Sequence, residues 1–444
     1  MSHAEKKDGA GKLGFWMSTS LVVGNMTGSG IFLLPAALAV YGGISIFGWL
    51  YTVAGAVFLA LMFSRLSRLI TRAGGPYAYV RAGFGEFPGF IVAWGYWISI
   101  WAGNAAIAVA GVGYLSVFIP GLEDNRLLSA IIAILAIWLF TFINTLNIRK
   151  VGMTQLITTI IKIIPLFVLG SLGFLFFDKT HFQPMNLSNE SDFSAITTTA
   201  ALSLWAFLGL ESATIPSDKV KTPARTIPRA TIAGILITSL LYISGTIAVM
   251  GIISPAELMD SSSPFADAAG SIWGKGASIL VAVCASIACF SALNGWILLQ
   301  GQIPLAASKD NLFPSWFKKT SGKGIPVPGL IIASMLATVL VGINFTRGLV
   351  EMFSFIIMLS TLSCLLPYLF SSLSEIAIRL MNKQLSGRRN LITSALISIP
   401  AFAYSIWAVT GLEYEVIAWG VILLATGLPV YLIRKIRRHK FINY

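Results

Sequence analysis

The segment GNMTGSGIFLLPA, residues 24–36, places small and polar residues at the centre of an apolar run that starts at Leu13. A glycine in a helix interior costs about 1 kcal/mol relative to alanine, so this composition disfavours an unbroken helix. A GxxxG packing face explains Gly24 and Gly28 alone. Such a face needs small residues on one side only, whereas residues 24–30 are small or polar almost all round. The segment therefore predicts a helix that is interrupted in the middle of an apolar stretch.

The whole chain has the composition of a membrane protein. Of its 444 residues, 56% are hydrophobic and 11% are charged, whereas about a quarter of the residues of a soluble domain are charged. Apolar stretches of about 20 residues recur along it, which is the length that crosses a bilayer. We expect an all-α membrane protein with twelve transmembrane helices in a single domain, at residues 14–40, 43–70, 87–119, 126–148, 153–177, 193–215, 228–253, 277–306, 325–345, 350–380, 390–411 and 414–434.

The net charge of +13 is explained by membrane topology. With an even number of spans and a cytoplasmic N-terminus, 26 of the 31 lysines and arginines fall on cytoplasmic segments, and only Arg126, Lys179, Lys275 and Arg347 fall outside. This is the positive-inside pattern, and it predicts that both termini are cytoplasmic. The basic residues are expected to contact anionic membrane lipid, not nucleic acid, and a bacterial-type inner (plasma) membrane is the expected location.

The sequence argues against an enzyme, a metal site and a channel. The three cysteines lie in predicted spans without metal-ligand spacing, and the three histidines lie outside the spans. An enzyme needs a nucleophile–base pair or a metal cluster, so we expect no catalytic residue, no metal and no cofactor. A channel is expected to show rings of pore-lining groups, whereas interrupted helices with single buried charges are typical of a carrier.

Two charged residues stand within predicted spans. Lys162 lies near the middle of the fifth span, and Glu211 lies at the end of the sixth. A charge at the centre of a span costs roughly 2.5–3.5 kcal/mol on insertion scales, so such residues are expected to have a function. The structural alternatives are that Lys162 extends to the membrane interface and that Glu211 lies among lipid headgroups.

A second interrupted segment, WAFLGLESATIP at residues 205–216, occurs five spans after the first. Paired interruptions in the two halves of a chain are typical of transporters built from inverted repeats, with the binding site at the membrane midplane. We therefore expect repeats at residues 14–177 and 193–380, with two further helices at 390–434. The free N–H end of a broken helix attracts a carboxylate and the free C=O end attracts a cation, so the breaks are suited to a zwitterion.

Six segments together resemble the amino acid–polyamine–organocation superfamily: GNMTGSGIFLLPA, GGPYAYVRAGFG, YWISIWAGN, SLWAFLGLESA, NGW at 294–296 and AASKDNLFP. The resemblance covers the whole chain in matching order, and it is strongest to the basic amino acid and polyamine antiporters, such as the arginine/agmatine antiporters. It implies a fold of five-plus-five inverted repeats, secondary transport of a small amino acid or amine, and a homodimer.

The resemblance also implies a substrate site, residue by residue. Backbone N–H groups at Ser29 and Gly30 would hold the substrate carboxylate, Trp205 would stack on the substrate, and Asn104 would bond its side chain. The implied substrate contacts are Met26, Ser29, Gly30, Tyr96, Ile100, Asn104, Ile107, Trp205, Leu208, Trp296 and Ser360. The implied coupling or gating residues are Lys162, Glu211, Tyr77 and Ser291, where Tyr77 matches a residue implicated in pH sensing.

Structural alternatives remain open for several of these residues. Tyr96 is also suited to anchoring at the membrane interface, Trp205 and Trp296 to packing, and Ser360 to bonding its own helix. The functional interpretation of the two tryptophans rests on the attraction between an aromatic face and an ammonium or guanidinium group.

Lys162 departs from the arginine/agmatine antiporters, which have a neutral residue there. A fifth-span lysine instead resembles proton-coupled or sodium-independent amino acid transporters, in which its ammonium reaches the broken first helix, here near Gly24, with Ser291 as a further partner. It acts there either as a proton carrier or as a fixed charge. Exchange of a cationic, arginine-like amino acid for a related amine or amino acid is favoured by Asn104, Trp296 and Ser360. Proton-coupled or exchange transport of neutral or broad-range amino acids is the alternative.

Overall fold

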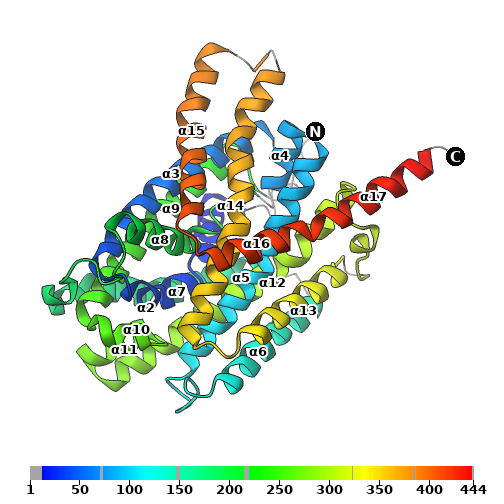
Figure 1. Ribbon diagram of the computed structural model, residues 1–444. Helices are drawn as coiled ribbons and strands as arrows, with labels where there is room; N and C mark the ends of the chain where they lie inside the picture. The colour runs from blue at the N-terminus through cyan, green and yellow to red at the C-terminus, as the bar shows by residue number, and fades with distance from the viewer. Residues whose placement is uncertain are drawn as a thin grey trace, which may run out of the picture.

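The computed structural model describes residues 13–70, 74–146, 151–214, 220–322, 324–382, 384–385 and 387–442. Within these ranges the chain is helical, and a single β-bridge joins Leu13 to Val220, which confirms the all-α class (Figure 1). The first half contains α1 (Phe15–Met26), α2 (Ser29–Ala39), α3 (Ser45–Leu69), α4 (Pro76–Phe84), α5 (Glu86–Leu115), α6 (Arg126–Leu146) and α7 (Val151–Leu172). The second half contains α8 (Asp192–Leu204), α9 (Pro223–Ile252), α10 (Pro255–Asp260), α11 (Pro264–Trp273), α12 (Lys275–Lys309), α13 (Val327–Asn344), α14 (Leu349–Met381), α15 (Arg388–Thr410), α16 (Tyr414–Ala425) and α17 (Gly427–Ile442).

Eleven segments of the described chain are long and apolar enough to cross a membrane. They agree with eleven of the twelve predicted spans to within a few residues. The remaining stretch, 193–215, is not among them because its helix α8 ends at Leu204, so a count of twelve stays a prediction. The first 12 residues and residues 147–148 of the predicted fourth span lie outside the described residues.

The predicted interruption of the first span is confirmed. Helix α1 ends at Met26 and α2 begins at Ser29. Between them the N–H of Thr27 still bonds Val23 O at 2.7 Å, whereas the N–H of Gly28 turns back to Met26 O at 2.8 Å. Gly28 has φ −114° and ψ −138°, outside the helical region. The glycine-rich composition therefore ends one helix and starts another within the same span.

The interruption after α8 is longer. A 3₁₀ turn at Trp205–Phe207 follows the helix, and Leu208 is extended at ψ 133°. Gly209 has φ +101°, a left-handed conformation that glycine adopts without steric cost. A second 3₁₀ turn covers Ser212–Thr214. Glu211 therefore lies in irregular backbone that is enclosed by protein, the setting in which such backbone is tolerated at membrane depth.

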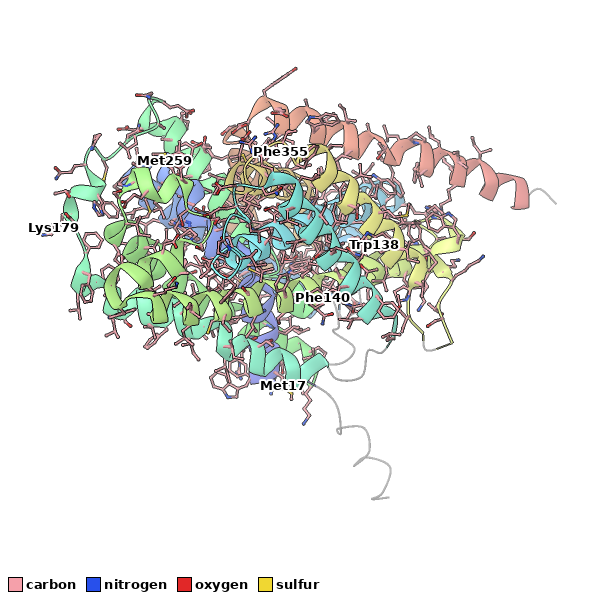
Figure 2. All side chains as sticks on the ribbon, turned by 90° about the horizontal axis from the view of Figure 1, so that it is seen from below. Met17, Trp138, Phe140, Lys179, Met259 and Phe355 are labelled. Carbon is pink, nitrogen blue, oxygen red and sulfur yellow. The ribbon has the colours of Figure 1, made fainter. Side chains whose placement is uncertain are left out.

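Helix α5 is the centre of the bundle. It packs against α12 and α14 and is buried along almost its whole length, as its central position in Figure 1 suggests. Helix α6 at the periphery instead exposes apolar side chains such as Leu135 and Phe142. Figure 2 shows Trp138 of α6 beside α13, where its indole N–H donates to Thr338 Oγ1 at 3.0 Å. The exposed apolar faces are suited to contact with lipid chains.

Candidate functional site

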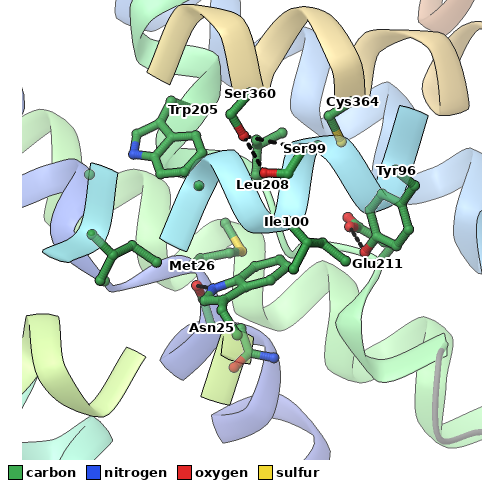
Figure 3. Close-up of a pocket in the computed structure, with 15 residues that line it drawn as sticks. Asn25, Met26, Tyr96, Ser99, Ile100, Trp205, Leu208, Glu211, Ser360 and Cys364 are labelled. Atoms are coloured by element: carbon green, nitrogen blue, oxygen red, sulfur yellow. Dashed lines mark hydrogen bonds between the residues drawn. The ribbon is translucent and has the colours of Figure 1, made fainter. Parts of the chain in front are cut away.

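The two helix interruptions meet at a pocket of about 430 Å³ in the middle of the bundle (Figure 3). Every residue that lines it is buried, so the pocket lies in the interior of the protein. Its lining comes from both interruptions and from α5, α12 and α14. The lining residues are Asn25, Met26, Gly28, Gly30, Tyr96, Ser99, Ile100, Gly103, Ile107, Trp205, Leu208, Glu211, Trp296, Ser360 and Cys364.

The start of α2 supplies backbone N–H groups to this pocket. The first N–H groups of any α-helix have no partner within the helix, and Gly28, which precedes α2, provides no side-chain cap. Gly28 and Gly30 both line the pocket. This arrangement is suited to a carboxylate. The side chain of Ser29 lies outside the described residues, and its predicted backbone contact with substrate stays a prediction.

Trp205 packs against two glycines that line the pocket, Gly30 and Gly103. A Cβ atom on Gly30 would lie 2.8 Å from Trp205 Cδ1, and a Cβ on Gly103 would lie 2.7 Å from Trp205 Cη2. Contacts this short are not tolerated, so only glycine at both positions lets the indole lie there. Trp205 therefore packs tightly and lines the pocket at the same time.

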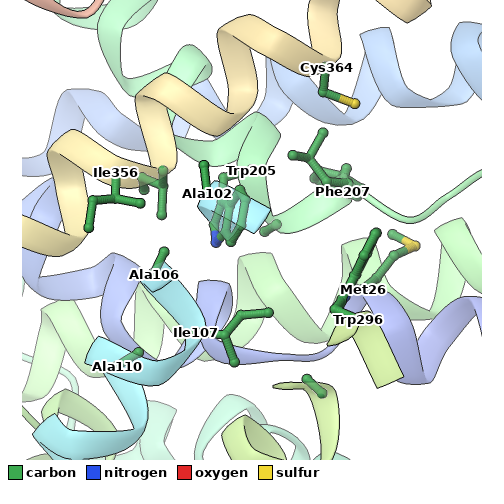
Figure 4. Packing of buried hydrophobic residues seen from close by; sticks show 14 of the residues in the cluster. Met26, Ala102, Ala106, Ile107, Ala110, Trp205, Phe207, Trp296, Ile356 and Cys364 are labelled. Atoms are coloured by element: carbon green, nitrogen blue, oxygen red, sulfur yellow. The ribbon is translucent and has the colours of Figure 1, made fainter. Parts of the chain in front are cut away.

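Trp296 joins α12 to the end of α1. Its indole N–H donates to Asn25 O at 3.2 Å, and a Cβ on Gly209 would lie 3.0 Å from its ring. Figure 4 shows Trp296 beside Met26 among the buried residues of the bundle. The carbonyl groups at the end of α1, which are suited to a cation, are thus partly occupied by this tryptophan.

A buried carboxylate held by two tyrosines forms one wall. Tyr96 donates to Glu211 Oε1 at 2.5 Å (Figure 3). Tyr368 donates to Glu211 Oε2 at 2.9 Å. All three side chains are buried, so the alternatives of an interfacial tyrosine and a glutamate among lipid headgroups are wrong. Within the described part of the chain, no basic side chain forms an ion pair with Glu211. Among the described residues, the carboxyl group of Glu211 therefore has two neutral hydroxyl donors and no cationic partner.

Ser360 bonds a neighbouring helix, so the alternative that it bonds its own helix is wrong. Its hydroxyl donates to Ser99 O at 2.7 Å and lies 3.1 Å from Ser99 Oγ. The residues that line the pocket without having been predicted as site residues are Asn25, Gly28, Ser99, Gly103 and Cys364. Ser99 lies three residues after Tyr96 and Cys364 four residues after Ser360, so helical spacing alone would have found them.

Lys162 lies behind the break in the first span. Its side chain is fully buried, so the alternative that it extends to the interface is wrong. The ammonium donates to Gly24 O at 2.9 Å, as expected for a lysine that reaches the broken helix. Ser291 is half-buried on α12, and it forms no hydrogen bond with Lys162 among the described residues. Lys162 does not line the pocket.

Two other predicted residues do not reach the pocket lining. Asn104 is fully buried and donates through Nδ2 to Gln300 Oε1 at 2.6 Å. Tyr77 is buried in α4, where its hydroxyl lies 3.4 Å from Asp310 Oδ2, and Asp310 also forms an ion pair with Arg81 at 3.2 Å. Met26, Gly30, Tyr96, Ile100, Ile107, Trp205, Leu208, Trp296, Ser360 and Glu211 do line the pocket.

A second, acidic cavity of about 930 Å³ lies by the α5–α6 loop, α10 and α11. Its carboxyl groups belong to Glu123, Glu257, Asp260 and Asp267, and none of the described residues that line it is basic. Glu123 accepts from Ser262 at 2.5 Å. Burial raises the pKa of Asp267, and the nearby Glu123 adds to this effect. In the predicted topology this cavity opens on the outer face, where its negative potential attracts cations.

Comparison with known proteins gives a consistent result. The family model for amino acid permeases matches residues 13–432. The chain is similar to a putative arginine/ornithine antiporter of Bacillus subtilis (strain 168), with 35% identity over 95% of this chain and 96% of that protein. It is also 35% identical to a cadaverine/lysine antiporter of Escherichia coli (strain K12) over 82% of both chains. A putrescine transporter of Haemophilus influenzae is 30% identical over 95% of this chain and 96% of its own length.

Proposed function

The chain belongs to the amino acid permease family, and from this premise we propose that it exchanges a cationic, arginine-like amino acid for a related amine or amino acid. Members of this family and the similar proteins above are transporters, so the chain is a multi-pass membrane transporter and not an enzyme. The substrates of those proteins, arginine and ornithine, lysine and cadaverine, and putrescine, all carry a positively charged side chain or amine. We extend this substrate class to the present chain.

The observation that carries the proposal is the carboxylate of Glu211. It lines the interior pocket and is held by two neutral hydroxyl donors, Tyr96 and Tyr368. A carboxyl group that is buried without a cation loses its charge at a cost, and a nearby cation favours its charged form, so a cationic substrate would pair with Glu211 in this pocket. The acidic outer cavity supports the same substrate class, because its potential raises the local concentration of cations.

The remaining contacts fit an amino acid with a cationic side chain. We propose that the N–H groups of Ser29 and Gly30 hold the carboxylate and that carbonyl groups near Met26 take the α-ammonium. Trp205 would cover the substrate, and Trp296 would form the opposite aromatic wall for a guanidinium or ammonium group. Ile100, Ile107 and Leu208 would contact its aliphatic part.

Lys162 supports a second candidate, proton-coupled or exchange transport of neutral or broad-range amino acids. Its ammonium on Gly24 O places a charge next to the first interruption, as in carriers that use a lysine in place of sodium. For the favoured function we propose a fixed charge that holds the end of α1 in place. For the alternative, Lys162 would bind and release a proton in each cycle.

We propose alternating access between two inverted repeats, 14–177 and 193–380, each of which begins with an interrupted span. The interior position of the pocket requires a movement before substrate enters or leaves. In this cycle Tyr96, with Glu211, forms the inner gate. Both termini would be cytoplasmic, basic residues would contact anionic lipid, and two copies would form a homodimer. Native mass spectrometry of the protein in nanodiscs tests the dimer.

Competition binding to the purified protein tests the substrate class. In this assay, bound labelled arginine competes with unlabelled arginine, ornithine, lysine, agmatine, citrulline or leucine. We expect ornithine and lysine to compete at least about tenfold better than leucine, because a single charge–charge contact exceeds 1.4 kcal/mol. Equal competition by leucine would favour the second candidate. In a separate uptake assay, a steep pH dependence that is lost in Lys162→Ala would assign the transported proton to Lys162.

A further inference from the structure

A chain of buried amides and hydroxyls runs behind the pocket wall and joins four helices. Asn104 Nδ2 on α5 donates to Gln300 Oε1 on α12 at 2.6 Å. Gln300 Nε2 donates to Leu330 O at 3.2 Å and to Ser334 Oγ at 2.7 Å, both on α13. Ser334 Oγ lies 2.6 Å from Thr141 Oγ1 on α6. Asn104, Gln300 and Ser334 are fully buried.

The chemistry of the partners fixes the direction of this chain. Leu330 O is a backbone carbonyl, which accepts hydrogen bonds and cannot donate them. Gln300 must therefore present Nε2 to Leu330 and Oε1 to Asn104. Asn104 must in turn present Nδ2 to Gln300, which assigns its amide orientation from the network. The oxygen of Asn104, Oδ1, is the group left over, and it has no hydrogen-bond partner among the residues that the structure describes.

Asn104 lies directly behind the pocket lining and is not part of it. Asn104 follows Gly103 in α5 and is one turn from Ile100 and Ile107, and these three residues line the pocket. Gln300 lies one turn after Trp296, which also lines it. A buried acceptor without a partner costs about 1–3 kcal/mol. A substrate donor group that reaches this oxygen would remove that cost.

We propose that Gln300 is a positioning residue that fixes the Asn104 amide with its oxygen as the free group, so that the site selects side chains that end in a hydrogen-bond donor. This inference deepens the proposed function and rests on it. An ammonium or guanidinium end satisfies Asn104 Oδ1, whereas an apolar end leaves it unpaired. The selection by Gln300 depends on donor groups and not on charge, which separates it from the effect of Glu211.

The test measures competition by three ligands in the wild type and in Gln300→Met, which keeps the length of the side chain and removes its hydrogen bonds. Arginine has donors and charge, citrulline has donors without charge, and norleucine has neither. A lost hydrogen bond to a charged group corresponds to about a tenfold loss of affinity or more, so the affinity for arginine should fall about tenfold in Gln300→Met. The affinity for citrulline should also fall, and the affinity for norleucine should be unchanged.

A double-mutant cycle shows whether Gln300 acts through Asn104. In an Asn104→Ala background, Gln300→Met should cause no further loss for arginine. Ser334→Ala removes one of the acceptors that hold Gln300 and serves as a milder second variant, with a smaller loss in the same direction. Gln302→Met is the matched control, because Gln302 lies on the opposite face of α12, two residues on, and is half-buried; its affinities should equal those of the wild type.

The outcomes separate this inference from the proposed function. A wild-type protein that binds no arginine refutes the proposed function. If the wild type binds arginine but Gln300→Met and Ser334→Ala both keep the arginine-to-norleucine ratio within twofold, the role of Gln300 alone is refuted. An equal loss for all three ligands would indicate general damage to the fold and would also overturn this role.

Discussion

Replacing Glu211 with glutamine removes the charge of the pocket while it keeps the shape of the side chain. The amide oxygen still accepts from one tyrosine, and the amide N–H₂ donates to the hydroxyl oxygen of the other, because a tyrosine hydroxyl both donates and accepts. In the wild type, Tyr96 and Tyr368 donate to Glu211 at 2.5 and 2.9 Å. In the variant, each tyrosine keeps one hydrogen bond to the side chain at position 211. The variant isolates the electrostatic contribution of the carboxylate.

The distance between the two charges sets the expected magnitude. Opposite unit charges about 5 Å apart attract by about 3 kcal/mol when the effective dielectric constant is about 20. Since 1.4 kcal/mol corresponds to a tenfold change in affinity, Glu211→Gln should weaken arginine binding about 100-fold. Citrulline has nearly the shape of arginine without its charge, so the affinity for citrulline should change by less than about threefold.

The assay is isothermal titration of the purified wild type and Glu211→Gln with both ligands, accompanied by thermal unfolding. The melting temperatures should agree within a few degrees, because both tyrosines keep a partner. Arginine affinity that stays within threefold of the wild type would refute the electrostatic role of Glu211. An equal loss for arginine and citrulline would show that the substitution disturbs the pocket itself.

Three further substitutions test other parts of the site. Gly103→Ala places a Cβ 2.7 Å from the ring of Trp205, so the KM for arginine uptake into proteoliposomes should rise about tenfold, the effect of roughly 1.4 kcal/mol. Lys162→Met removes the hydrogen bond to Gly24 O and should lower the exchange rate at least about tenfold at both pH 6 and pH 8; an unchanged rate would remove the role of this lysine. Glu257→Gln in the outer cavity should raise the KM for arginine about twofold at low ionic strength and leave it unchanged in high salt, because salt screens exposed charges.

The Gly103 prediction has a matched control on another helix. Gly342 lies in α13, where an added Cβ meets no atom within 4 Å. Gly342→Ala should therefore leave the KM unchanged. Wild-type kinetics in Gly103→Ala would mean that Trp205 moves aside without cost and is not held by the glycine.

The interrupted helices were predictable because their cause is local. Residues 24–30 and Gly209 disfavour a continuous helix through their own backbone and side-chain chemistry, whatever surrounds them. The contact between Lys162 and the broken helix was expected from the resemblance to transporters with a lysine in the fifth span, and the hydrogen bond to Gly24 O agrees with it. The resemblance implied Tyr96, Ile100, Asn104 and Ile107 as contacts along α5, and the pocket lining contains all of them except Asn104.

The contacts between helices were not predictable in the same way. Tyr368 was missed because nothing in its own segment indicates that its hydroxyl reaches Glu211, which lies 157 residues away. The position of Asn104 behind the pocket lining depends on Gln300, and this partner becomes apparent only when α5 and α12 are packed together. The partner of Ser360 depends in the same way on the packing of α14 against α5. Such pairings are set by tertiary structure, which spacing within one helix does not report.

Exchange in proteoliposomes tests the central claim most directly. Uptake of labelled arginine would be measured in vesicles preloaded with arginine, agmatine or ornithine, and in empty vesicles with an imposed pH gradient. A cationic amino acid exchanger predicts rapid uptake into the preloaded vesicles and only background uptake into the empty ones. Uptake into empty vesicles that follows the pH gradient, or no arginine uptake in any vesicle, would contradict it.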